Sequence, residues 1–175
     1  MLNYATTHSR DRCKQFEKPQ KMKLREYLAD RLREVFTEGK WVLGTNFKEQ
    51  IIDLDWNQAT QKIDNLNTIA DLTFHIDYYI AGVAKVLKGG TLDIRDKYSF
   101  DYPPIESEQD WKNLVNKFCL DSEEFIELVE KMSDEKILSD FVDKQYGTYY
   151  RNIDAMIEHT YYHLGQIILI KKRIK

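Results

Sequence analysis

Few residues in the sequence interrupt helices. Only three prolines and seven glycines occur among its 175 residues. Proline lacks a backbone N–H and glycine is conformationally permissive, so both tend to end regular elements. Their scarcity favours long helices over many short strands. The sequence therefore predicts an all-α protein.

Cysteines and long apolar runs are also scarce. The two cysteines, Cys13 and Cys119, lie in unrelated contexts, which does not indicate a disulfide framework. No stretch approaches the roughly 20 apolar residues that a helix needs to cross a bilayer, and the polar N-terminus has no apolar core of the kind that a secretory signal carries. A net charge of −3 provides no basic footprint for nucleic acid. We therefore expect a cytoplasmic protein with free thiols that binds neither membranes nor nucleic acids.

The remaining composition is that of an ordinary globular domain. Hydrophobic residues make up 42% of the chain and charged residues 31%, a balance that supports a packed core rather than disorder. A chain of 175 residues suits one domain with one core. Because residues 1–20 lack apolar periodicity, we predict a polar, flexible N-terminal extension there and a single domain over residues 21–175.

Four stretches of the chain repeat apolar residues at the spacing of a helix face. Glycines or a serine cap mark several of their ends, and we predict helices over residues 22–39, 57–88, 107–132 and 150–173. The turn-rich, aromatic connection over residues 91–104 is expected to pack over one end of these helices. Four long helices with two substantial connections predict a four-helix bundle.

Three of the four histidines in the chain lie on predicted helices. His159 and His163 are four residues apart, so their side chains share one face of the last helix. His75 lies on the corresponding flank of the second long helix, beside its apolar stripe. Such a set either holds one divalent metal ion, which satisfies three neutral imidazoles at once, or consists of hydrogen-bonded histidines at the edge of the core. The residues alone leave both interpretations open.

The segments around these histidines resemble the DinB-like superfamily. Residues 157–167 (IEHTYYHLGQI) are similar to the last-helix motif of that family, and residues 68–75 (TIADLTFH) to its second-helix histidine segment. Where many members have a further histidine or an arginine, this chain has Tyr162 and Leu164. The resemblance implies a four-helix bundle, often homodimeric, that binds a divalent metal ion, typically zinc or nickel, on His75, His159 and His163.

A site with three histidine ligands would be an open one. Three imidazoles leave the ion its full charge and free positions for water or substrate, which is typical of catalytic sites. Asp71, one turn before His75, is a candidate general base or a candidate acceptor that orients that imidazole. Gln166 either reaches the site beside His163 or is a solvent-exposed helix residue. Acid–base groups are therefore few, which suits activation of a bound thiol better than hydrolysis.

The resemblance also implies a function. DinB-like proteins include metal-dependent transferases and isomerases that use low-molecular-weight thiols such as bacillithiol or mycothiol. We therefore expect a metal-dependent enzyme that acts on a small molecule, with thiol S-transfer as the first hypothesis and metal-dependent hydrolysis as the second. The alternatives are a stress-related protein that binds a small molecule without turnover, and a structural protein that dimerises through its aromatic surface.

Overall fold

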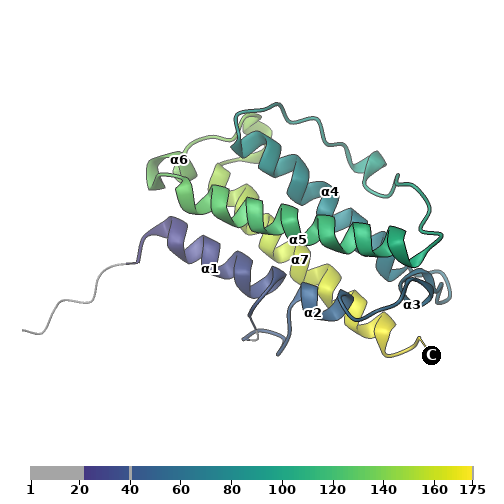
Figure 1. Ribbon diagram of the computed structural model, residues 1–175. Coiled ribbons are helices and arrows are strands. Elements are labelled where there is room, and N and C mark those ends of the chain that lie inside the picture. The colour runs from purple at the N-terminus through teal and green to yellow at the C-terminus, as the bar shows by residue number, and fades with distance from the viewer. Residues whose placement is uncertain (1–21, 40, 175) are drawn as a thin grey trace, which may run out of the picture.

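The computed structural model describes residues 22–39 and 41–174 (Figure 1). Within these residues the chain forms seven α-helices and two short 3-10 helices, and the only β-type pairing is one isolated bridge between Asp140 and Thr148. The prediction of an all-α protein is therefore confirmed. The predicted N-terminal extension, residues 1–20, lies outside the described residues. No helix in the described part of the chain is long and apolar enough to cross a bilayer.

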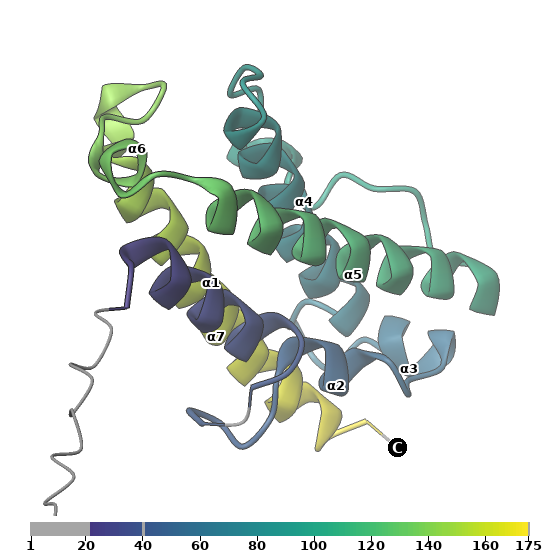
Figure 2. The same ribbon diagram turned by 60° about the vertical axis from the view of Figure 1, so that its left-hand side comes forward.

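Four long helices build the body of the molecule, and each of them packs against two of the others. Helix α5 contacts α1 and α4, and helix α7 contacts the same two helices from the other side (Figures 1 and 2). The contacts thus close into a ring in which α4 and α7 are direct neighbours. The four helices are α1 (Leu24–Phe36), α4 (Ile69–Leu87), α5 (Glu108–Lys131) and α7 (Tyr149–Lys171).

Short helices fill the connections between these four. Helix α2 packs against α7, and α3 packs against α4 and α5. Their bounds, with those of the remaining short elements, are α2 (Phe47–Ile51), α3 (Trp56–Thr60), η1 (Asp96–Tyr98), α6 (Asp134–Leu138) and η2 (Lys144–Tyr146). Fully buried aromatic side chains tie these elements to the core, since Phe47 of α2 stacks on Phe118 of α5 with ring centroids 4.6 Å apart.

The predicted helix over residues 57–88 is wrong at its N-terminal third. Helix α3 ends at Thr60 and α4 begins only at Ile69. Asp64 between them has a positive φ of 48°, which a continuous right-handed helix does not allow. A capping box then starts α4, because the Asp71 amide donates to the Thr68 hydroxyl and the Thr68 amide donates to the Asp71 carboxylate.

The connection between α4 and α5, residues 88–107, runs back along the outside of α4 rather than over one end of the helices (Figure 1). The ring of Tyr102 stacks on Phe74 of α4 with centroids 4.7 Å apart. Further along the helix, the hydroxyl of Tyr78 accepts a hydrogen bond from the Arg95 amide at 2.8 Å and donates one to the Arg95 carbonyl at 3.1 Å. This α4–α5 connection therefore forms a wall along one side of α4.

Candidate metal centre

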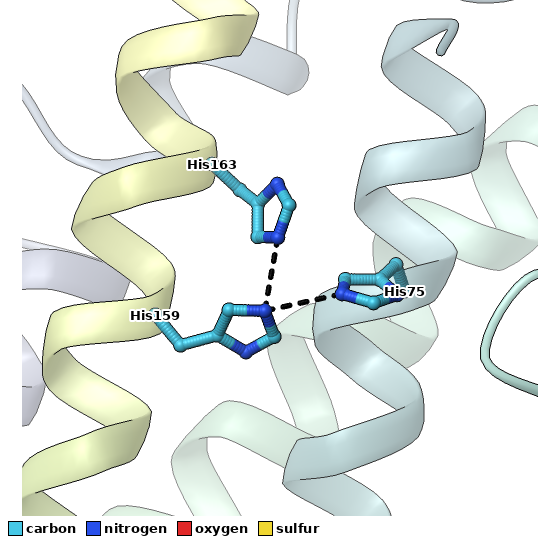
Figure 3. Close-up of side chains that lie close together, drawn as sticks. All are labelled: His75, His159 and His163. Atoms are coloured by element: carbon cyan, nitrogen blue, oxygen red, sulfur yellow. Dashed lines mark hydrogen bonds between the residues drawn. The ribbon is translucent and has the colours of Figure 1, made fainter. Parts of the chain in front are cut away.

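Helices α4 and α7 place three histidines opposite one another. His75 lies in the second turn of α4, and His159 and His163 project from successive turns of α7 toward it (Figure 3). The Nε2 atom of His159 lies 3.1 Å from that of His75 and 2.9 Å from that of His163. All three ligand atoms lie within 4.8 Å of one another. The three side chains singled out from the sequence therefore form one cluster that can hold a metal ion.

The spacing of these nitrogens suits a small divalent ion. Imidazole nitrogens bound at about 2.0–2.1 Å to a tetrahedral ion lie about 3.3 Å from each other. The two short contacts of His159 measure 3.1 and 2.9 Å, so each has to lengthen by only a few tenths of an ångström. The ligand atoms of His75 and His163 lie within 4.8 Å of each other.

Hydrogen bonding among the imidazoles alone does not satisfy the cluster. The Nδ1 atom of His163 lies 2.8 Å from Oε1 of Gln166, which accepts the Nδ1 proton and leaves Nε2 of His163 unprotonated. The Nε2 atom of His159 has room for one proton or one lone pair, yet it faces two other ring nitrogens. A cation at the point where the three nitrogens meet would satisfy all of them at once.

Burial keeps the imidazoles in the neutral form that binds metal. Desolvation, together with repulsion from a charged His163, lowers the pKa of His75 to about 4. The pKa of His159 also falls to about 4, first through desolvation and then through the two neighbouring imidazoles. Desolvation likewise lowers the pKa of His163, although its contact with Gln166 opposes this change. At neutral pH the cluster therefore offers three lone pairs and no charge of its own.

Aromatic rings cover the sides of the cluster. Phe100 of the α4–α5 connection stacks on His75 with centroids 4.4 Å apart and planes inclined by 16°. Tyr79, one turn after His75, presents an edge to His75 at 5.1 Å and to His159 at 5.3 Å. These rings exclude water and fix the orientation of the imidazoles, as the apolar shell of a metal centre does.

No protein-family model, curated protein or solved structure matches this chain. Support for a metal centre therefore comes from three features of the cluster. The three imidazoles converge, the contact with Gln166 leaves a lone pair on Nε2 of His163, and the imidazoles are neutral at neutral pH.

The two candidate supporting residues, Asp71 and Gln166, differ in position. Gln166 contacts His163 directly, as one of the two interpretations of its sequence position predicts. Asp71 is instead engaged at the start of α4, where its carboxylate accepts hydrogen bonds from the Thr68 amide and from the Tyr102 hydroxyl at 2.8 Å. Among residues 22–39 and 41–174, no carboxylate is hydrogen-bonded to any of the three imidazoles.

An open cleft of about 550 Å³ lies beside the cluster, and His159 is one of its lining residues. It lies between α4, α7, the α4–α5 connection and the segment that precedes α7, and Phe141 and Tyr146 of that segment contribute to its wall. Tyr79 and Asp96 form its polar side, where the tyrosine hydroxyl donates to the carboxylate at 2.7 Å. Desolvation raises the pKa of Tyr79 to about 12, and the bond to Asp96 adds to this effect.

Sequence reasoning missed most of the cleft. Tyr79 was identifiable as a neighbour of His75, because the two are four residues apart on one helix face. Arg95, Asp96 and Phe100 carry no signal of this kind, since they lie in an irregular segment whose path follows from tertiary contacts.

Proposed function

We propose that the protein binds one divalent metal ion, zinc or nickel, on His75, His159 and His163, and that it is a thiol S-transferase. One observation supports this above all others: the ring nitrogens of three histidines converge, and one of the three, His159, lines an open cleft. Because α1, α4, α5 and α7 contact one another in a closed ring, we propose that they form a four-helix bundle of the DinB-like type.

Each group around the cluster has a defined task in this proposal. A bound divalent ion with an open position supplies Lewis acidity, which lowers the pKa of a thiol or a water molecule. The imidazoles hold the ion without neutralising its charge. Gln166 fixes the ring of His163, and Phe100 shields His75 from water. The cleft beside His159 admits the reactants.

Thiol transfer suits the scarcity of acid–base groups. An ordinary thiol has a pKa of about 8.5, so a modest decrease ionises it at neutral pH without a strong general base. The thiol releases its proton to solvent, its sulfur attacks an electrophilic carbon, a carbon–sulfur bond forms, and the leaving group departs with the bonding electrons. No carboxylate of the described residues contacts the imidazoles, and this reaction needs none.

Hydrolysis is the second candidate function, and the position of Asp96 is the observation that favours it. This carboxylate lines the cleft, accepts a hydrogen bond from Tyr79, and raises the pKa of both His75 and His159 through its charge. A carboxylate so placed can accept a proton from an attacking water molecule. Asp96, rather than Asp71, would be the general base of such a reaction.

Metal content and turnover together test the proposal. Protein purified without a polyhistidine tag should carry close to one equivalent of zinc or nickel, measured by inductively coupled plasma mass spectrometry. The metal-loaded protein should couple thiols to 1-chloro-2,4-dinitrobenzene with release of chloride, and a chelator should abolish the reaction. His75→Ala, His159→Ala and His163→Ala should each lose the metal and the activity.

Asp71→Asn provides the matched control. Asp71 lies one turn from His75, but its carboxylate binds Thr68 and Tyr102 instead of the cluster, so this variant should keep its metal. Stoichiometric metal without any thiol turnover, combined with hydrolysis of ester or amide substrates, would favour the second function. Metal-free protein that is unaffected by loss of the histidines would reject both.

A further inference from the structure

Arg95 lines the cleft and is not paired with a carboxylate of any described residue. It is an exposed residue of the α4–α5 connection, and it lines the same cleft as His159. Among the described residues, its guanidinium makes no hydrogen bond and no ion pair. The nearby carboxylate of Asp93 is already bound by Lys85 and Thr91, and the charge of Arg95 makes only a minor contribution to lowering its pKa.

The backbone of Arg95 is fixed although its side chain is free. The Tyr78 hydroxyl binds both the amide and the carbonyl of this residue, and the next residue, Asp96, is held by the hydroxyl of Tyr79. Two adjacent tyrosines of α4 therefore anchor the position from which the guanidinium projects. The backbone at this position is therefore ordered before a ligand binds, and binding has to order only the arginine side chain.

A second arginine near the cleft shows the contrast. Arg151 lines a smaller neighbouring cavity on α7, but its guanidinium is paired with Glu158 at 2.9 Å and with Asp154 at 3.7 Å. Arg95 differs from Arg151 because, among the described residues, no carboxylate pairs with its guanidinium. The carboxylate of Asp96, which also lines the cleft, accepts a hydrogen bond from Tyr79 instead. The apolar wall is formed by Val83, Leu92, Ile94, Phe141 and Met156.

We propose that the cleft binds a small molecule with an apolar body and an acidic group, and that Arg95 binds the acidic group. The thiol or electrophile of the proposed reaction would then lie along the apolar wall, with its reactive end toward His159 and its carboxylate on the guanidinium. Arginine suits this role because its planar donors match a carboxylate in a bidentate manner. This inference rests on the proposed metal centre for one end of the ligand only.

Cobalt-loaded protein and a matched pair of thiols provide the test. Binding of 6-mercaptohexanoate and of 6-mercaptohexanol is measured through the sulfur-to-cobalt absorption band. The six-carbon chain prevents a small chelate ring, so any preference for the acid has to come from the protein. Wild-type protein should bind the acid about tenfold or more tightly than the alcohol. Arg95→Gln should reduce this ratio to about one, and Arg95→Lys should retain part of it.

Lys97→Gln is the matched control, because it removes the same charge two residues away and Lys97 does not line the cleft. It should leave the ratio of the two affinities unchanged. A ratio near one in the wild type, or an undiminished ratio in Arg95→Gln, overturns the inference while leaving the metal centre intact.

A second measurement separates failure of the metal centre from failure of this inference. Hexanoate and hexanol are titrated into the metal-free protein, and the side-chain Nε–H resonance of Arg95 is followed by NMR. Hexanoate should shift this resonance and hexanol should not, whether or not cobalt binds to the histidines. An unresponsive Arg95 resonance at saturating hexanoate would exclude the guanidinium as the acid-binding group.

Discussion

Helix α4 buries a titratable side chain on each of two sides, and the two side chains have different kinds of partner. Toward α5, the carboxylate of Asp77 is 1% exposed and accepts a hydrogen bond from Lys117 at 2.6 Å, so the chain supplies its own counter-charge. Toward α7, His75 meets two further imidazoles and no charged partner. The ion pair of Asp77 and Lys117 is complete within the chain and is therefore a structural feature. The three imidazoles converge without a group of opposite charge, as the ligands of a metal ion do.

Zinc binding should change the stability of the protein more than any other test. This change should depend on the histidines between α4 and α7 and not on the Asp77–Lys117 pair between α4 and α5. A ligand present at roughly a thousand times its Kd adds about 4 kcal/mol to the free energy of unfolding. For a chain of this size, the Tm should rise by about 8–16 °C. The shift is measured by calorimetry with and without zinc, and it should vanish in His159→Ala but persist in Lys117→Met. If His159→Ala and Lys117→Met lost the Tm shift equally, the two sides of α4 would not differ in zinc binding.

Loss of Lys117 should have the next largest effect on the free energy of unfolding. Lys117→Met leaves the Asp77 carboxylate buried without its partner, and we expect a loss of about 2 kcal/mol in urea unfolding. This is less than for a fully buried pair, because the lysine side chain is 52% exposed and the carboxyl group can take up a proton. Asp121, the second partner of Lys117, is less buried, so Asp121→Asn should cost under about 1 kcal/mol. If Lys117→Met proves neutral, the pair does not stabilise the interface of α4 and α5.

The pH dependence of stability should reveal the cost of burying Asp77. Desolvation raises the pKa of this carboxyl from 3.8 to about 6, although Lys117 opposes the change. The folded state then holds the proton more tightly than the unfolded state, so the stability contributed by Asp77 is full below pH 4 and is lost as the pH rises through about 6. Between pH 4 and 7, the unfolding free energy of the wild type should fall relative to that of Asp77→Asn by on the order of 2 kcal/mol. A chelator keeps the histidines metal-free in both proteins, so their titration is the same in each and cancels in the difference. A difference that stays constant with pH would contradict the raised pKa of Asp77.

Much of the fold and the three clustered histidines could be predicted from the sequence. The predicted boundaries of the third and fourth long helices, Ser107 and Tyr150, agree with the structure to within a residue or two, because a serine cap and an apolar stripe define them. His159 and His163 share a face by helix geometry alone. The approach of His75 to this pair is a tertiary contact, which the flank position on α4 indicated but did not determine.

The parts that sequence reasoning missed depend on local hydrogen bonds and on an irregular segment. The false extension of α4 toward residue 57 ignored the capping box of Thr68 and Asp71, which is a readable signal. The same capping role explains why Asp71 is turned toward Thr68 and Tyr102 instead of His75. The path of residues 88–107 along α4 had no periodicity to predict it, because single contacts such as that of Phe100 with His75 determine it.

Replacement of two helix glycines by alanine should have the smallest predicted effects on the free energy of unfolding. A Cβ atom on Gly82 of α4 would lie 2.2 Å from Cγ2 of Ile94, whereas one on Gly165 of α7 would meet nothing within 4 Å. Gly165→Ala should therefore stabilise the protein by about 0.5–1 kcal/mol, since alanine is the better helix former. Gly82→Ala gains the same propensity but overpacks the α4–α5 connection, and we expect a net loss of about 1 kcal/mol in urea unfolding.

Removal of Cγ2 distinguishes a steric cause from a general defect in α4. In the Ile94→Ala background the contact at 2.2 Å is removed and only the Cβ atom of residue 94, at 3.3 Å, remains close, so Gly82→Ala should become less destabilising or stabilising there. Hydrogen exchange of the Arg95 amide, which is bound to Tyr78, should accelerate in Gly82→Ala and return toward the wild-type rate in the double variant. Equal stabilisation by Gly82→Ala and Gly165→Ala in the wild type would mean that the connection is not packed on α4, and His75 would then lose the wall that encloses it.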